Sequence, residues 1–114
     1  IIVVNQLLLY LAGGKQVNEK IAAQILIYND LWEKTDKSVI ADNVEKYLFI
    51  KFPECSGTFD TKMNKLEEIT GSKRQTIYAW LNRSRNRVKV PLMKLCTIAN
   101  ALDVDIADLL KKEY

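Results

Sequence analysis

The 114-residue sequence contains no histidine. Histidine is the commonest metal ligand and the usual general acid or base near neutral pH. Its absence excludes every catalytic scheme that needs an imidazole, and it excludes most metal sites. The sequence also has no phosphate-binding glycine loop and no glycine-flanked nucleophile. We therefore predict that the protein is not an enzyme and that it has no metal and no cofactor.

Cysteines and long apolar runs are also scarce. Cys55 and Cys96 lie far apart and have no partners at the spacing of a zinc site. We expect two reduced, buried thiols, which fits a cytoplasmic location. The longest apolar run, residues 1–12, is shorter than the roughly 20 residues of a membrane-spanning helix. It also lacks a basic leader, so we expect neither a membrane span nor a signal peptide.

Only four glycines and two prolines divide the chain, and the segments between them have the apolar periodicity of helices. Apolar side chains recur every three or four residues from Val17 to Lys34. Residues 1–12 fit a short helix or a β-branched strand, and a helix is favoured because no other segment offers a partner strand. The sequence therefore predicts an all-α bundle of six or seven helices.

Capping residues predict where these helices begin and end. Pro53 would end the helix that follows Lys34, Gly71 would end the next in a left-handed conformation, and Pro91 suits the first turn of a later helix. The side chains expected to cap helix starts are Asp36 or Ser38, Asp60 or Thr61, and Asp105.

The net charge of +3 is unevenly distributed along the chain. Residues 73–94 contain seven basic and no acidic residues, which gives this window a charge of +7 and leaves −4 for the remainder. All four arginines of the protein lie in the window, and the arginine fork matches phosphates and guanine edges. The pattern favours a nucleic-acid partner over a merely solvated face.

The basic window begins where two predicted helices meet in a tight turn at Gly71. This is the arrangement of a DNA-binding helix-turn-helix, whose second helix enters the major groove. The apolar residues expected to face the core are Met63, Leu66, Ile69, Ile77, Trp80 and Leu81. The outer face of the second helix would carry Arg74, Gln75, Tyr78, Ala79 and Asn82. Arginine and glutamine pair in bidentate fashion with guanine and adenine, respectively.

Residues 63–110 resemble the lambda-repressor-like DNA-binding domain of the Cro/CI or XRE type. The resemblance rests on the spacing of Leu66, Gly71, Ile77 and Trp80, and on residues 91–110, which are similar to the family's fourth and fifth helices. It implies a compact bundle of about five helices in a transcriptional regulator that binds operators as a dimer. Residues 38–52 would supply the first helix.

The resemblance also implies roles for individual residues. The base-reading positions would be Arg74, Gln75, Tyr78 and Ala79. We expect phosphate contacts from the following residues: Lys73, Asn82, Arg83, Arg85, Arg87 and Lys89.

The turn departs from the family pattern at three positions. Glu67 replaces the small residue usual where the two helices touch, and a buried unpaired carboxylate there would be costly. Either the helix crossing opens or Glu67 lies at its edge. Ser72 and Lys73 replace an apolar and a capping residue, and we expect Ser72 to take over the cap.

The sequence as a whole divides into an apolar helical extension, residues 1–35, and a helix-turn-helix domain, residues 38–114. The extension would either mediate dimerisation or partner binding, or pack as a flap on the same domain. The predicted function is sequence-specific binding of double-stranded DNA by a homodimeric, repressor-like regulator, with the helix that starts near Lys73 in the major groove. Two alternatives remain: a protein-interaction module that reuses the fold, and an RNA-binding protein.

Overall fold

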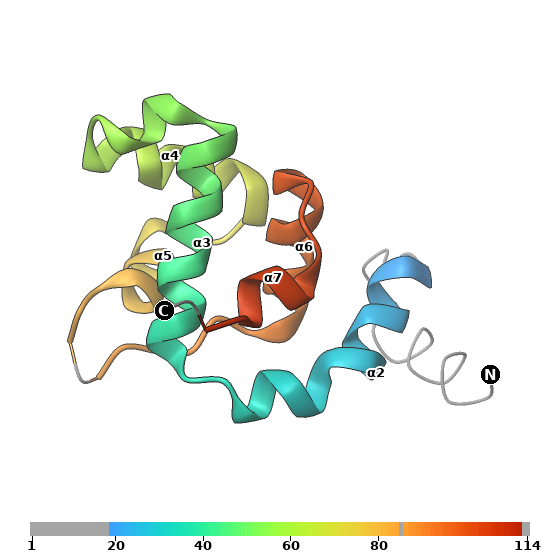
Figure 1. Ribbon diagram of the computed structural model, residues 1–114. Helices are drawn as coiled ribbons and strands as arrows, with labels where there is room; N and C mark the ends of the chain where they lie inside the picture. Colours follow the sequence, from blue (N-terminus) through green and yellow to red (C-terminus); the bar gives the residue numbers. More distant parts are fainter. Residues whose placement is uncertain (1–18, 85, 113–114) are drawn as a thin grey trace.

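The computed structural model describes residues 19–84 and 86–112 (Figure 1). This part of the chain contains no strand, and the predicted all-α bundle is confirmed. The elements are α2 (Glu19–Lys34), α3 (Lys37–Lys51), the 3-10 helix η1 (Pro53–Ser56), α4 (Phe59–Thr70), α5 (Arg74–Leu81), α6 (Leu92–Leu102) and α7 (Ile106–Leu110). The choice between helix and strand for residues 1–12 lies outside the described residues.

Helix α3 is the centre of the bundle. It packs against η1, α5, α6 and α7, so it serves as the first helix of a five-helix arrangement that continues through α4 to α7. In Figure 1, α5 lies on one side of α3 and α6 and α7 on the other. The largest fully buried side chains are Ile40, Val44, Leu48, Met63, Leu66, Ile77, Val90, Leu95, Ile98, Ile106 and Leu109. The two free cysteines, Cys55 and Cys96, are buried among them, as predicted.

Two of the expected N-caps are in place. Asp36 Oδ1 accepts hydrogen bonds from the amide and hydroxyl of Ser38, at 2.7 and 2.6 Å, and these bonds hold the pKa of Asp36 below its ordinary value. Asp105 begins α7 in a capping box with Asp108. Gly71 ends α4 with a φ of +68°, the left-handed conformation that glycine adopts at little cost.

Two details of the predicted connections are wrong, the start of α4 and the place of Pro91. Helix α4 starts earlier than expected, because Thr58 Oγ1 caps it by accepting from the Thr61 amide at 3.1 Å. Thr61 is therefore a donor in the first turn and not the cap. Pro91 occupies the N-cap of α6 and not its first turn. The connector after Pro53 folds into the 3-10 helix η1, whose Cys55 contributes to the core.

Helix α2 packs on the bundle through α6 and α7. Ala22 is fully buried, and the partly buried side chains of α2 that pack against the core are Ile21, Ile25, Tyr28 and Trp32. The Trp32 indole donates a hydrogen bond from Nε1 to the Val90 carbonyl at 2.9 Å. This part of the extension thus packs as a flap, although Leu26, Ile27 and Leu31 remain exposed on its other side.

Trp32 is the main attachment of α2 to the loop that precedes α6. Because Trp32 is only partly buried, we expect Trp32→Ala to lower the free energy of unfolding by about 2 kcal/mol, less than truncation of a fully buried tryptophan. The measurement is urea denaturation followed by far-UV circular dichroism. Asp30→Ala, at an exposed position of the same helix, should change stability by less than about 0.5 kcal/mol. Equal stability of the two variants would contradict the attachment.

Candidate nucleic-acid interface

Helices α4 and α5 pack together across the turn at Gly71. Two hydrogen bonds from backbone amides hold the turn. The Gly71 amide donates to the Glu67 carbonyl at 2.8 Å, and the Ser72 amide donates to Thr70 Oγ1 at 3.1 Å. Lys73 stands at the N-cap of α5 and makes no side-chain capping bond. The expectation that Ser72 caps α5 is therefore wrong. The Ser72 amide donates to a side chain of α4, and the N-cap of α5 is the next residue, Lys73.

The outer face of α5 is open to solvent. Gln75, Thr76 and Tyr78 are exposed, and Ala79 is half-buried. The Tyr78 ring meets Phe59, the first residue of α4, edge to face, with ring centroids 6.2 Å apart. Sequence reasoning missed both Thr76 and Phe59. The signal in the sequence was Thr58, because an N-cap at this residue makes Phe59 the first residue of α4 and brings its ring close to Tyr78.

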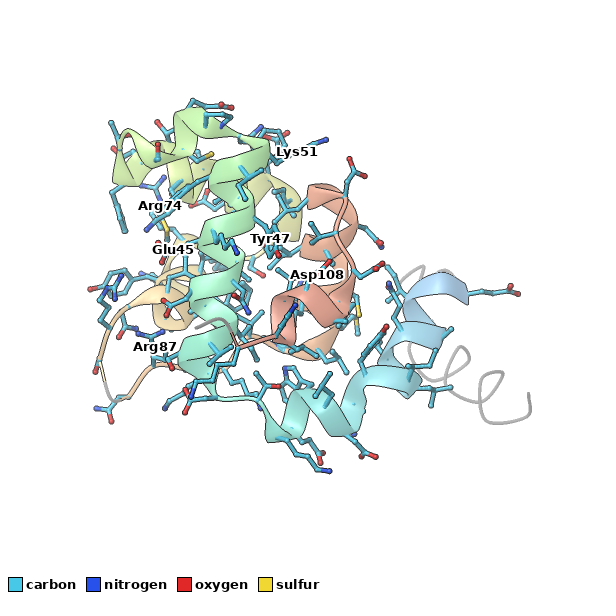
Figure 2. All side chains as sticks on the ribbon, in the orientation of Figure 1. Glu45, Tyr47, Lys51, Arg74, Arg87 and Asp108 are labelled. Atoms are coloured by element: carbon cyan, nitrogen blue, oxygen red, sulfur yellow. The ribbon has the colours of Figure 1, made fainter. Side chains whose placement is uncertain are left out.

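Arg74, expected to read bases, is bound to α4 (Figure 2). Its Nε donates to Glu67 Oε1 at 2.9 Å, its Nη1 donates to Asp60 Oδ1 at 2.9 Å, and its Nη2 donates to Asn64 Oδ1. The hydrogen bond to Glu67 is the largest cause of a raised pKa at Arg74. Glu67 is therefore partly exposed at the edge of the helix contact and paired, which resolves the departure from the family pattern.

Two of the expected phosphate-binding residues face inward. The Lys89 ammonium donates to the backbone carbonyls of Trp32 and Glu33 at the end of α2, and it lies 4.2 Å from the centroid of the Trp32 ring. Burial lowers the pKa of Lys89. Arg87 is only 9% exposed and lies near enough to Asp36 to help lower the pKa of that carboxyl, beside the start of α3 (Figure 2).

The other polar groups of the basic window are divided between internal and external roles. Asn82 uses its amide to cap α5, with bonds to the Tyr78 and Ala79 carbonyls at 3.0 and 3.1 Å. Lys94 caps α4 by donating to the Thr70 carbonyl at 2.8 Å. Lys73 and Arg83 are exposed at the two ends of α5. Arg85, also expected to bind phosphate, lies outside the described residues.

The described residues contain no cluster of three or more histidine, cysteine, aspartate or glutamate side chains that could hold a metal ion. Within the same residues, no helix has the length and apolar content needed to cross a membrane.

Residues 60–113 match the family model of the Cro/C1-type HTH DNA-binding domain. The match begins in the first turn of α4 and includes α5, α6 and α7. It leaves out α2 and α3, although α3 forms the centre of the same core. No curated protein and no solved structure shows a significant match to the chain.

The different placements of Arg83 and Lys89 predict different effects on DNA binding. Arg83→Ala should weaken binding to any duplex and reduce the slope of log K against log salt by about one, the loss of a single phosphate contact. Lys89→Met keeps the packed stem and should leave the salt slope unchanged while lowering the unfolding midpoint. Fluorescence anisotropy with a labelled random duplex over a salt series measures both slopes. A reduced slope for Lys89→Met would show that Lys89 contacts phosphate after all.

Proposed function

We propose, from the premise that residues 60–113 form a Cro/C1-type helix-turn-helix DNA-binding domain, that the protein binds a specific double-stranded DNA sequence and represses transcription there. The observation that carries this proposal is the solvent-exposed face of α5 after the left-handed turn. The side chains of Gln75, Thr76 and Tyr78 on this face are exposed to solvent.

In the proposed complex α5 lies in the major groove. Gln75 offers an amide that can pair in bidentate fashion with adenine, and the Ala79 methyl can contact a thymine methyl. Tyr78 is oriented by its edge-to-face contact with Phe59. Lys73 and Arg83, exposed at opposite ends of α5, would contact the phosphate backbones on either side of the groove.

Gln75 supplies the sharpest test of base reading. Selection of bound duplexes from a random library by the unaltered protein should yield a defined site. Gln75→Ala should lose the preference at one base pair, a discrimination of about 1–3 kcal/mol, and keep the rest of the site. Thr76→Ala, the matched control for a shortened polar side chain on the same helix, should change the preference at a different base pair and leave the one read by Gln75 unchanged.

Competition distinguishes the alternatives. If single-stranded RNA displaced the labelled site more effectively than duplex DNA, the exposed Phe59–Tyr78 pair would be an RNA-stacking platform instead. Absence of binding to every nucleic acid at low salt would favour the protein-interaction module.

We further propose that the protein acts as a homodimer joined through the outer side of α2. Leu26, Ile27 and Leu31 are 38%, 70% and 45% exposed, respectively, and lie on the side of α2 that does not pack on the bundle. Helix α2 contacts α6 and α7 but not α5, and Figure 1 draws it away from α5. A second copy on α2 would therefore leave both recognition helices available for two half-sites.

Sedimentation provides the measurement for this dimer. At about 100 µM, well above the dissociation constants of specific complexes, the protein should sediment as a dimer. Ile27→Asp should give a monomer because a charge would be desolvated in the interface. Asn29→Ala, exposed on the same helix, should leave the dimer intact. Monomers for all three proteins would disprove the interface.

A further inference from the structure

Arg74 differs from its neighbours on α5 in the direction of its side chain. Arg74 and the buried Leu81 are seven residues apart, close to two helical turns, so they lie on nearly the same side of α5. Arg74 therefore lies on the flank that faces the bundle. The centre of the outer face belongs to Gln75 and Ala79. The position thus directs the Arg74 side chain toward α4, where Glu67, Asp60 and Asn64 receive it.

The hydrogen bonds to α4 take up three of the five N–H groups of the Arg74 guanidinium. A bidentate contact needs two N–H groups on one edge of the guanidinium, directed into the groove. Each of the three nitrogens, Nε, Nη1 and Nη2, already donates to an acceptor on α4. These three bonds hold the guanidinium against α4, and a bidentate contact with guanine would require it to turn from α4 into the groove.

Charge also favours the bound position. Two carboxylates, Asp60 and Glu67, share one guanidinium, so the group carries a formal charge of −1. If Arg74 moved away, both carboxylates would be left without this partner beside the polyanionic DNA. Releasing Arg74 would therefore leave two unpaired carboxylates on the surface proposed to face DNA.

Helix α5 has few other anchors at this end. Its N-cap residue, Lys73, makes no side-chain capping bond, and the first buried residue of α5 is Ile77. The bonds from Arg74 are thus the side-chain connection that fixes the first turn of α5 to α4.

We infer that Arg74 is a positioning residue: its guanidinium fastens the start of the recognition helix to α4 through Glu67, Asp60 and Asn64, and it contacts no base. The part of this inference that concerns DNA rests on the proposed function. It assigns sequence reading to Gln75, Thr76, Tyr78 and Ala79, and it replaces the base-reading role expected for Arg74 from the sequence.

The test compares Arg74→Ala, Glu67→Ala and the double variant, which keeps the net charge of the unaltered protein. On the duplex selected by the unaltered protein, each single variant should lose about three- to tenfold in affinity, and the double variant should lose no more than Arg74→Ala. Repeated site selection should return the same sequence for all three. Glu67→Gln keeps an acceptor oxygen for Nε and should restore most of the affinity lost in Glu67→Ala.

A direct base contact would give a different pattern. Arg74→Ala would then lose the preference at one base pair, as Gln75→Ala should, while Glu67→Ala would keep the full site and its affinity. That pair of results would overturn the inference.

The inference can also be tested without DNA. The unfolding midpoints of Arg74→Ala, Glu67→Ala and the double variant form a double-mutant cycle. Non-additive losses, with the double variant close to either single variant, support the fastening role. Additive losses would overturn it, even if the unaltered protein bound no duplex and the proposed function itself had failed.

Discussion

The contact between α4 and α5 across the left-handed turn at Gly71 is the constraint on which the rest of the structure depends. It sets which face of α5 enters the core, through Ile77, Trp80 and Leu81, and therefore which face is left for DNA. The buried residues of α4 fix the distance between the helices, and the bonds of Arg74 fix the first turn of α5. Helix α5 can be as short as eight residues because its neighbours determine its orientation.

The basic window has two physical roles in the structure. Within the molecule, Arg74 pairs with two carboxylates, Lys89 packs on the Trp32 ring and Lys94 ends α4. Arg87 is buried. Lys73 and Arg83 keep their charges at the surface. The basic side chains left at the surface of the described residues are thus fewer than the +7 of the window suggests.

The sequence was informative wherever the deciding interaction is local. Apolar periodicity, the glycine at the turn and the caps at Asp36 and Asp105 involve residues only a few positions apart, and they predicted the all-α fold and the position of α5. The missed features depend on contacts between distant segments. Lys89 binds α2 carbonyls more than fifty positions earlier in the chain, and Arg74 reaches back to Asp60. Thr58 was missed for another reason, since several adjacent residues could serve as a cap and packing chooses among them.

The position of Trp32 has a consequence for how this domain can be divided. The indole and the Lys89 ammonium join α2 to the loop that leads out of the recognition helix, and α3 supplies much of the hydrophobic centre. A fragment trimmed to residues 60–113 would lose all of these supports at once. The smallest transplantable unit of this protein therefore reaches back at least to α2. Any chimera that exchanges α5 therefore has to carry the loop between α5 and α6 together with α2, which binds that loop.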